Sequence, residues 1–153
     1  MAIKEKLEHD LHEAMRANDT IKKNVIRMAL SAIKLQEVET RKTLTDPEVV
    51  ALLYKEIKMR EETIADALKI DRQDIIAENN TELEILKGYL PRQLSETELQ
   101  TLVDEAIQST GARSVKEMGM VMKAVIERAQ GSVSNAAISA AVKARLAALE
   151  NQP

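Results

Sequence analysis

The chain has no cysteine, phenylalanine or tryptophan, and its only aromatic residues are Tyr54 and Tyr89. Without thiols there are no disulfide bonds, cysteine nucleophiles or cysteine-ligated metal sites. The scarcity of aromatic residues disfavours β-strands, in which aromatic and β-branched side chains are enriched. Ala, Leu, Ile, Met, Glu and Lys dominate the 153 residues instead, and these residues favour helices. The composition therefore predicts an all-α protein.

Long hydrophobic runs are also missing. No segment approaches the roughly 20 apolar residues that a membrane-spanning helix needs. The N-terminus leads into an amphipathic segment rather than the apolar run of a secretory signal. A chain without cysteine also suits a reducing cytosol. We therefore expect a cytoplasmic protein that does not associate with a membrane.

Glycine and histidine are too scarce for the common catalytic motifs. The four glycines form no glycine-rich phosphate loop. His9 and His12 stand one helical turn apart, but no third or fourth zinc ligand follows at a fixed spacing. The glutamates of the long helices lack the Glu-x-x-His pairs of di-metal bundles. We expect no catalytic residue, no metal and no cofactor, and the chain is not expected to be an enzyme on its own.

Basic residues are in slight deficit overall, with a formal net charge of −3, whereas nucleic-acid-binding proteins usually carry a basic excess. Their distribution is uneven. Residues 1–90 hold 15 Lys and Arg against 18 Asp and Glu, whereas residues 111–149 hold six against two. The C-terminal third is therefore the part of the chain best suited to an anionic partner.

Apolar residues at helical spacing predict four helices before residue 91. The first runs from Ile3 to Ala17, the second follows a cap at Thr20, the third opens with the capping box Thr45–Glu48, and the fourth runs from Ile75 to Tyr89. The second helix is apolar over a broad face from Val25 to Leu35, which predicts packing on two sides. Long helices with short connections predict antiparallel neighbours.

The segment Gly88-Tyr89-Leu90-Pro91 predicts a domain boundary, because glycine ends helices and proline cannot continue one. Three short helices are expected beyond it. They open at the capping boxes Ser95–Glu98 and Ser114–Glu117 and at Ser134, and glycines at 111 and 131 close the first two. The sequence thus predicts an N-terminal domain of long antiparallel helices at 1–90 and a C-terminal three-helix bundle at 91–153.

A candidate phosphate-binding patch lies on the second of these short helices. Met118 and Met122 share its apolar face, whereas Met120 projects from the opposite side with Lys116 and Lys123. Gly119 leaves room for a close approach. The full set of candidates, including basic residues at the margins and on the last helix, is Arg113, Lys116, Gly119, Met120, Lys123, Arg128 and Lys143. A merely solvated polar face explains the same charges equally well.

Several motifs resemble the GatB/YqeY family. They are Tyr-Leu-Pro-Arg-Gln-Leu-Ser at 89–95, Lys-Glu-Met-Gly-Met-Val-Met-Lys at 116–123 and Ala-Met-Arg-Ala-Asn-Asp at 14–19. The resemblance covers nearly the whole chain, and the first two motifs are fairly specific as a pair. One departure follows Gly131, where the family typically has an acidic residue and a glycine. Ser134 caps a helix as well as aspartate does, but a ligand role for that acidic position does not carry over.

This resemblance implies a helical N-terminal domain and a C-terminal domain similar to the tail of the B subunit of glutamine-dependent Asp-tRNA/Glu-tRNA amidotransferase, which touches tRNA. The catalytic part of that enzyme lies in other domains. The implied function is a non-catalytic, tRNA-associated adaptor. Its implied partners are tRNA and components of the amidotransferase or of aminoacyl-tRNA synthetases. With so few aromatic residues, contact is expected with phosphate and shape rather than by base stacking.

Two other functions remain open. One is a component of glutamine-dependent tRNA amidation, a carbon–nitrogen ligase reaction with glutamine as amido donor. The other is a protein-interaction helix bundle that binds no RNA. The sequence determines neither the oligomeric state nor the tRNA species.

Overall fold

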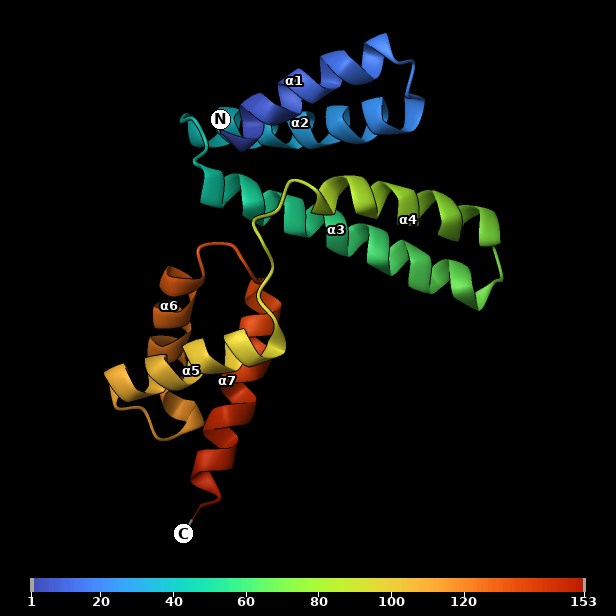
Figure 1. Cartoon of the computed structure of the whole chain (residues 1–153). Coiled ribbons are helices and arrows are strands. Elements are labelled where there is room, and N and C mark those ends of the chain that lie inside the picture. Colours follow the sequence, from blue (N-terminus) through green and yellow to red (C-terminus); the bar gives the residue numbers. More distant parts are fainter. Residues whose placement is uncertain (1, 153) are drawn as a thin grey trace. The chain divides into compact units, whose positions relative to one another are not determined.

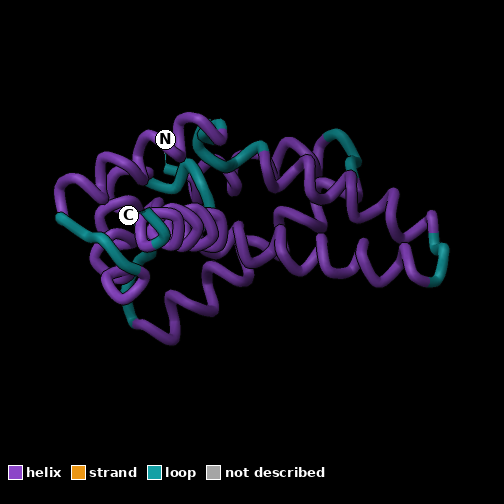
Figure 2. The backbone as a smooth tube through the Cα atoms, turned by 90° about the horizontal axis from the view of Figure 1, so that it is seen from below, coloured by secondary structure: helices purple, strands orange, loops and turns teal. Residues whose placement is uncertain are grey.

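The computed structural model describes residues 2–152, which form seven α-helices, one short 3-10 helix and no strand (Figure 1, Figure 2). The prediction of an all-α fold is confirmed. The backbone separates into two compact units, Met1–Leu90 and Pro91–Pro153, called here the N-terminal and C-terminal units. Among the described residues, no helix has the length and apolar character required to traverse a bilayer.

The N-terminal unit contains α1 (Ile3–Arg16), α2 (Thr20–Thr40), α3 (Asp46–Lys69) and α4 (Gln73–Lys87). In Figure 1, α1 and α2 form one helical hairpin, and α3 and α4 form another. All four helices contribute large aliphatic side chains to one core. Its most deeply buried members are Leu7, Val25, Ile26, Ile33, Val49, Leu53 and Leu86.

The sequence predicted one helix start in this unit correctly and another incorrectly. The capping box of α3 is confirmed, because the backbone N–H and hydroxyl of Thr45 both contact the Glu48 carboxylate, at 3.4 and 3.0 Å. The predicted cap at Thr20 is wrong. Asp19 caps α2 instead, since its carboxylate accepts the N–H of Lys22 at 3.1 Å, and Thr20 is the first helical residue.

The side chain of Tyr89 links the C-terminal end of this unit to α1. The helix α4 begins and ends two residues earlier than predicted, so Tyr89 lies beyond it and is buried. Its hydroxyl donates a 2.5 Å hydrogen bond to Asp10, and the Lys6 ammonium lies 5.5 Å from its ring centroid. The hydrogen bond from Tyr89 lowers the pKa of Asp10, and burial raises the pKa of Tyr89.

Arg60 of α3 is the one charged residue buried in the described chain. Its guanidinium donates to the Glu56 carboxylate at 2.9 Å, and its Nε lies 3.5 Å from Glu82 of α4. A buried charge is tolerated only when it is paired, so this group links α3 to α4.

The expectation that α2 packs on two sides is confirmed, because α2 contacts α1 along one side and the α3–α4 hairpin along another. A third strip of α2 is exposed. Val25 and Ile33 are buried against the core, but Met28 and Leu35, on another side of the helix, are 53% and 62% exposed. The Met28 sulfur lies 3.9 Å from the guanidinium of the buried Arg60, so this strip is exposed but not free of contacts.

The C-terminal unit contains α5 (Glu96–Thr110), the 3-10 helix η1 (Val115–Glu117), α6 (Met118–Ala129) and α7 (Asn135–Glu150). Each of the three α-helices contacts the other two. Its core consists mainly of small side chains: Val103, Ala106, Ala112, Val121, Val125, Ala129, Ile138, Val142 and Leu146.

Two caps in the C-terminal unit are as predicted and one is not. Ser95 and Ser134 accept the N–H groups that open α5 and α7. The predicted box at Ser114–Glu117 is wrong, because the Glu117 carboxylate accepts the N–H of Arg113 at 3.1 Å and residues 115–117 form the 3-10 helix. This turn places Lys116 directly before α6 rather than inside it.

Candidate nucleic-acid interface

Charge in the C-terminal unit is segregated by element. The helix α5 carries four carboxylates and no basic residue: Glu96, Glu98, Asp104 and Glu105. The segment 111–149, which includes η1, α6 and most of α7, carries six basic residues against two acidic ones. An anionic partner therefore meets repulsion at α5 and attraction on the other side of the unit.

Two of the six basic residues form ion pairs with carboxylates of α5. The Arg145 Nε lies 2.9 Å from the Asp104 carboxylate. Arg128, a marginal candidate in the predicted patch, lies 3.7 Å from the Glu105 carboxylate and also donates to the Ser109 hydroxyl at 3.4 Å. Arg128 therefore serves an interhelical contact, and a partner would have to compete for it.

The other four cations are exposed and form no ion pair with any described residue: Arg113, Lys116, Lys123 and Lys143. Lys116 belongs to η1 and Lys123 to α6, and both side chains are exposed. Lys143 is exposed on α7. Lys116 and Lys123 therefore remain a predicted patch on η1 and α6, and Lys143 belongs to a separate helix.

The first turn of α6 is open to a partner. Gly119 has no positive φ, and a Cβ atom added there meets no atom within 4 Å, so neither conformation nor packing requires glycine. The start of α6 is continued by η1, in which the N–H of Met118 bonds the carbonyl of Val115 and the Glu150 carboxylate accepts the N–H of Val115 at 2.8 Å. Met120 is 49% exposed beside Gly119, whereas Met118 and Met122 pack against the core as predicted.

Acidic residues limit the positive charge of this face. Glu117 lies between Lys116 and α6, with its carboxylate turned back to the backbone N–H of Arg113. Glu127 is exposed one turn beyond Lys123. The face formed by η1 and α6 is therefore only weakly positive, and any phosphate binding should fall quickly with added salt.

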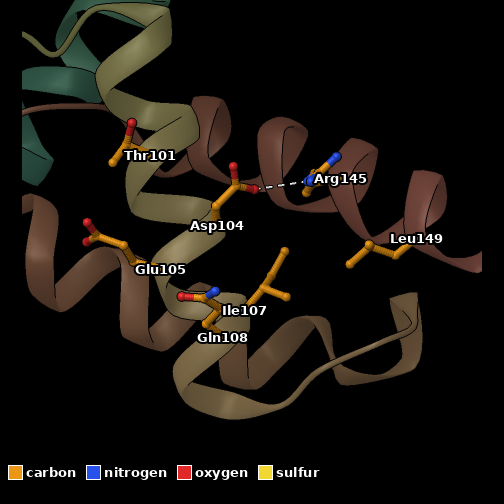
Figure 3. Close-up of a pocket in the computed structure, with 7 residues that line it drawn as sticks. All are labelled: Thr101, Asp104, Glu105, Ile107, Gln108, Arg145 and Leu149. Atoms are coloured by element: carbon orange, nitrogen blue, oxygen red, sulfur yellow. Dashed lines mark hydrogen bonds and ion pairs between the residues drawn. The ribbon is translucent and has the colours of Figure 1, made fainter.

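A cavity of about 450 Å³ lies between α5 and α7 (Figure 3). Its polar groups are mostly engaged. The figure shows Asp104 bonded to Arg145, and the Thr101 hydroxyl donates to the backbone of Thr97. Gln108 also lines the cavity, but its amide side chain is not a catalytic group. We therefore read the cavity as the seam between two helices.

The start of α5 is electrostatically fixed. Arg92 donates two hydrogen bonds to Glu98, at 2.6 and 3.2 Å, and these bonds lower the pKa of Glu98 to about 2. Glu98 also closes the capping box on Ser95. The Arg92 guanidinium and the Glu98 carboxylate are therefore paired with each other. Within residues 2–152, no three side chains of His, Asp or Glu gather as metal ligands.

Sequence reasoning found the exposed lysines but missed which cations are already paired. Asp104 and Arg145 are 41 residues apart, and Glu105 and Arg128 are 23 apart, so no local spacing signals either pair. The sequence also gave no signal for the buried Arg60.

A family model described as Yqey-like protein matches residues 4–146 of the chain. Curated relatives carry the name Altered inheritance of mitochondria protein 41, mitochondrial. The protein of Vanderwaltozyma polyspora is 30% identical over 120 residues, which cover 73% of this chain and 64% of the relative. That of Pyrenophora tritici-repentis is 31% identical over 134 residues, covering 83% and 73%. That of Lachancea thermotolerans is 38% identical over 85 residues, covering 55% and 46%.

The match covers about two thirds of the length of the Vanderwaltozyma polyspora relative and about half of the Lachancea thermotolerans relative. Their names describe mitochondrial proteins, which contradicts the expectation of a cytoplasmic location. That expectation depended on missing cysteine and a missing apolar leader. Neither feature distinguishes the cytosol from a mitochondrion, because mitochondrial transit peptides are amphipathic rather than apolar.

Proposed function

The chain belongs to the YqeY-like family, and on that premise we propose that its C-terminal unit is a non-catalytic RNA-binding module through which the protein acts as a tRNA-associated adaptor. The observation that carries this proposal is the open face of η1 and α6. There, Lys116 and Lys123 have no ion-pair partner among the described residues and flank a glycine with free space above it.

The chemistry of this face suits a phosphate backbone. An unpaired lysine gives up no internal salt bridge when it binds phosphate, and Gly119 lets a phosphate approach the first turn of α6. The C-terminal unit has no aromatic residue on which a base could stack. The proposed contact therefore reads phosphate position and RNA shape and has little preference for sequence.

The proposal includes a division of labour between the two units. The C-terminal unit, residues 91–153, is the RNA-binding domain, and the N-terminal unit, residues 1–90, is a separately folded helical domain. Both have their own apolar core. Arg113 and Lys143 are auxiliary contacts, and Arg128 contributes least because Glu105 already holds it.

The test is tRNA binding by the full chain at several salt concentrations. The wild type is compared with a Lys116→Ala, Lys123→Ala variant. A matched control, Lys55→Ala with Lys58→Ala, removes two exposed lysines of α3 that form no ion pair within the described residues. Each lost phosphate contact should lower the steepness of log K against log salt by about 0.7 to 1.

The proposal expects a flatter slope and weaker binding for the α6 variant and wild-type behaviour for the α3 control. Equal slopes for all three proteins, or equal losses in both variants, would remove this face from consideration. If no tRNA binds even at low salt, the RNA-binding function itself is wrong.

A further inference from the structure

The exposed side of α2 carries a line of apolar side chains. Ile21, Met28 and Leu35 follow one another at intervals of seven residues, and they are 43%, 53% and 62% exposed. Seven residues return a helix to within about 20° of the same direction, so the three side chains form one narrow line. Val38, 66% exposed, extends it toward the end of the helix. These four residues are called here the α2 seam.

The α2 seam is long enough for helix pairing. From Ile21 to Val38 it spans about 26 Å at 1.5 Å per residue. Apolar residues repeated every seven positions are the pattern by which one helix accepts the side chains of another. At 100° per residue, Ile21, Met28 and Leu35 lie within about 40° of arc, and Val38 lies about 60° further round the helix.

A row of basic residues borders the seam on one side. Arg27 and Lys34 are exposed one heptad apart on α2, and the exposed Arg41 follows the helix as its C-cap residue, with a left-handed backbone of φ 56°. None forms an ion pair within residues 2–152; the one contact of the Arg27 guanidinium is the Met15 sulfur at 3.9 Å. These three residues are called here the α2 basic row.

The acidic residues of α2 do not neutralise this row. The Glu37 carboxylate is engaged by the Lys4 ammonium at 2.8 Å and by the N–H of Leu44 at 2.9 Å. Glu39 is exposed, but at 100° per residue it falls near the seam, away from the row. The exposed side of α2 thus combines an apolar line with an uncompensated positive edge.

We propose that this side of α2 docks an amphipathic helix of a partner protein, with apolar residues at heptad spacing and carboxylates along one flank. The partner's apolar residues would cover the seam, and its carboxylates would pair with the basic row. This surface goes beyond the proposed RNA contact, because it lies in the other unit and selects a different class of partner.

The same features disfavour two other occupants. If RNA bound to this side of α2, the apolar seam would still face water or phosphate. In a second copy of the chain docked antiparallel about a two-fold axis, both basic rows would lie along the same edge, where like charges repel. An acidic helix satisfies the seam and the row together.

The probe is a labelled three-heptad helical peptide of about 21 residues, with Leu and Ile at the seam-facing positions and Glu on both flanks. A second peptide is identical except that Lys replaces every flanking Glu. Binding of each to the full chain is followed by fluorescence anisotropy, and helix content of every variant is checked by circular dichroism.

Two neutral variants separate the seam from general hydrophobicity. Met28→Gln with Leu35→Gln removes the centre of the seam. Met59→Gln with Leu68→Gln removes a methionine and a leucine that are 51% and 61% exposed on α3, and is the matched control. A charge-reversal variant, Arg27→Glu with Lys34→Glu, tests the basic row.

The proposal expects saturable binding of the acidic peptide below about 100 µM, a loss of about tenfold or more in the seam variant, and less than about twofold change in the control. The charge-reversal variant should prefer the lysine peptide. No binding of the acidic peptide up to about 100 µM, equal binding of both peptides, or an equal loss in the control would overturn the proposal.

Two further results would overturn it in favour of another occupant. One is a dimer of the wild type, seen by analytical ultracentrifugation, that the seam variant abolishes while the acidic peptide fails to compete. The other is binding to phosphatidylserine vesicles that depends on the seam when the peptide does not bind. Failure of either kind leaves the tRNA result for α6 unchanged, so the two proposals fail separately.

Discussion

Both units bury an apolar core, but the N-terminal unit also buries a paired arginine and exposes many large apolar side chains, whereas the C-terminal unit exposes few of them. Of the ten large apolar residues exposed in the described chain, eight belong to the N-terminal unit and only Met120 and Ile126 belong to the other. The two proposals assign a different partner to each unit: an acidic amphipathic helix to the N-terminal unit and RNA phosphate to the C-terminal unit.

The two cores differ in the same direction. Leucine and isoleucine fill the N-terminal core, and valine and alanine dominate the C-terminal one. Each small side chain buries less apolar area, and burial stabilises the fold by about 25 cal/mol per Å². The C-terminal unit should therefore be the less stable of the two, and the predictions below test whether the units behave separately.

The largest expected effect comes from separating the units. A fragment of residues 91–153 should fold alone and melt cooperatively, because its core is contributed by α5, α6 and α7. A fragment of residues 1–90 should do the same at a higher temperature. Circular dichroism melts of both fragments check this. A non-cooperative melt of 91–153 would show that the C-terminal unit depends on the rest of the chain.

The next effect concerns buried against exposed ion pairs. Arg60→Met should destabilise the N-terminal unit by about 3–5 kcal/mol, because Glu56 and Glu82 lose their buried partner. Arg145→Met in the other unit removes an arginine whose side chain is 39% exposed, and should cost less than about 1 kcal/mol.

Denaturant unfolding of both variants measures this contrast. Adding Glu56→Gln and Glu82→Gln to Arg60→Met should restore much of the loss, since no carboxylate is then left unpaired. Equal losses for Arg60→Met and Arg145→Met would abolish the distinction between the units.

Local signals explain which parts of the fold were predictable. The boxes at Thr45 and Ser95 were correct because cap and partner are three residues apart. The box at Ser114 failed because Glu117 finds the N–H of Arg113 instead. The N-terminus of α1 is served by Asp46, which accepts the N–H of Ile3 across 43 positions, a contact that no local pattern shows.

The candidate site follows the same rule. Exposure of Lys116, Met120 and Lys123 could be predicted from helical periodicity, because it depends on one segment alone. The pairing of Arg128 with Glu105 depends on how α5 and α6 approach each other, and the sequence does not contain that distance. The broad apolar face of α2 predicted its packing on two sides, but the exposure of Met28 and Leu35 could not be predicted from the sequence.

A smaller effect tests how the N-terminal unit ends. Tyr89→Phe should cost about 1.5 kcal/mol at neutral pH, because Asp10 loses a hydrogen bond to its charged form. The Asp10 pKa is lowered in the folded state, chiefly by Tyr89. This contribution is therefore present above the unfolded value of about 3.9 and is lost as the pH falls through the lower folded value.

Urea titrations of wild type and Tyr89→Phe between neutral and acidic pH follow this difference. It should shrink as the pH falls below about 4. A difference that stays constant down to the acid limit would mean that packing of the ring, rather than the hydrogen bond to Asp10, explains the loss.

The smallest effect has opposite signs for stability and binding. Gly119→Ala should stabilise the C-terminal unit by up to about 1 kcal/mol, because alanine is the better helix former and the site is open. The added methyl group should weaken tRNA binding if phosphate approaches this turn. Thermal melts and the salt titration measure both. A stabilised variant with unchanged binding would show that nothing approaches Gly119.

If the two surfaces bind two partners independently, one crossed experiment shows it directly. Wild type, the Lys116→Ala, Lys123→Ala variant and the Met28→Gln, Leu35→Gln variant are each titrated with tRNA and with the acidic peptide. The account predicts that the lysine variant loses tRNA binding and keeps the peptide, and that the seam variant does the reverse. A variant that loses both ligands equally, or a lysine variant that keeps tRNA at every salt concentration, would contradict it.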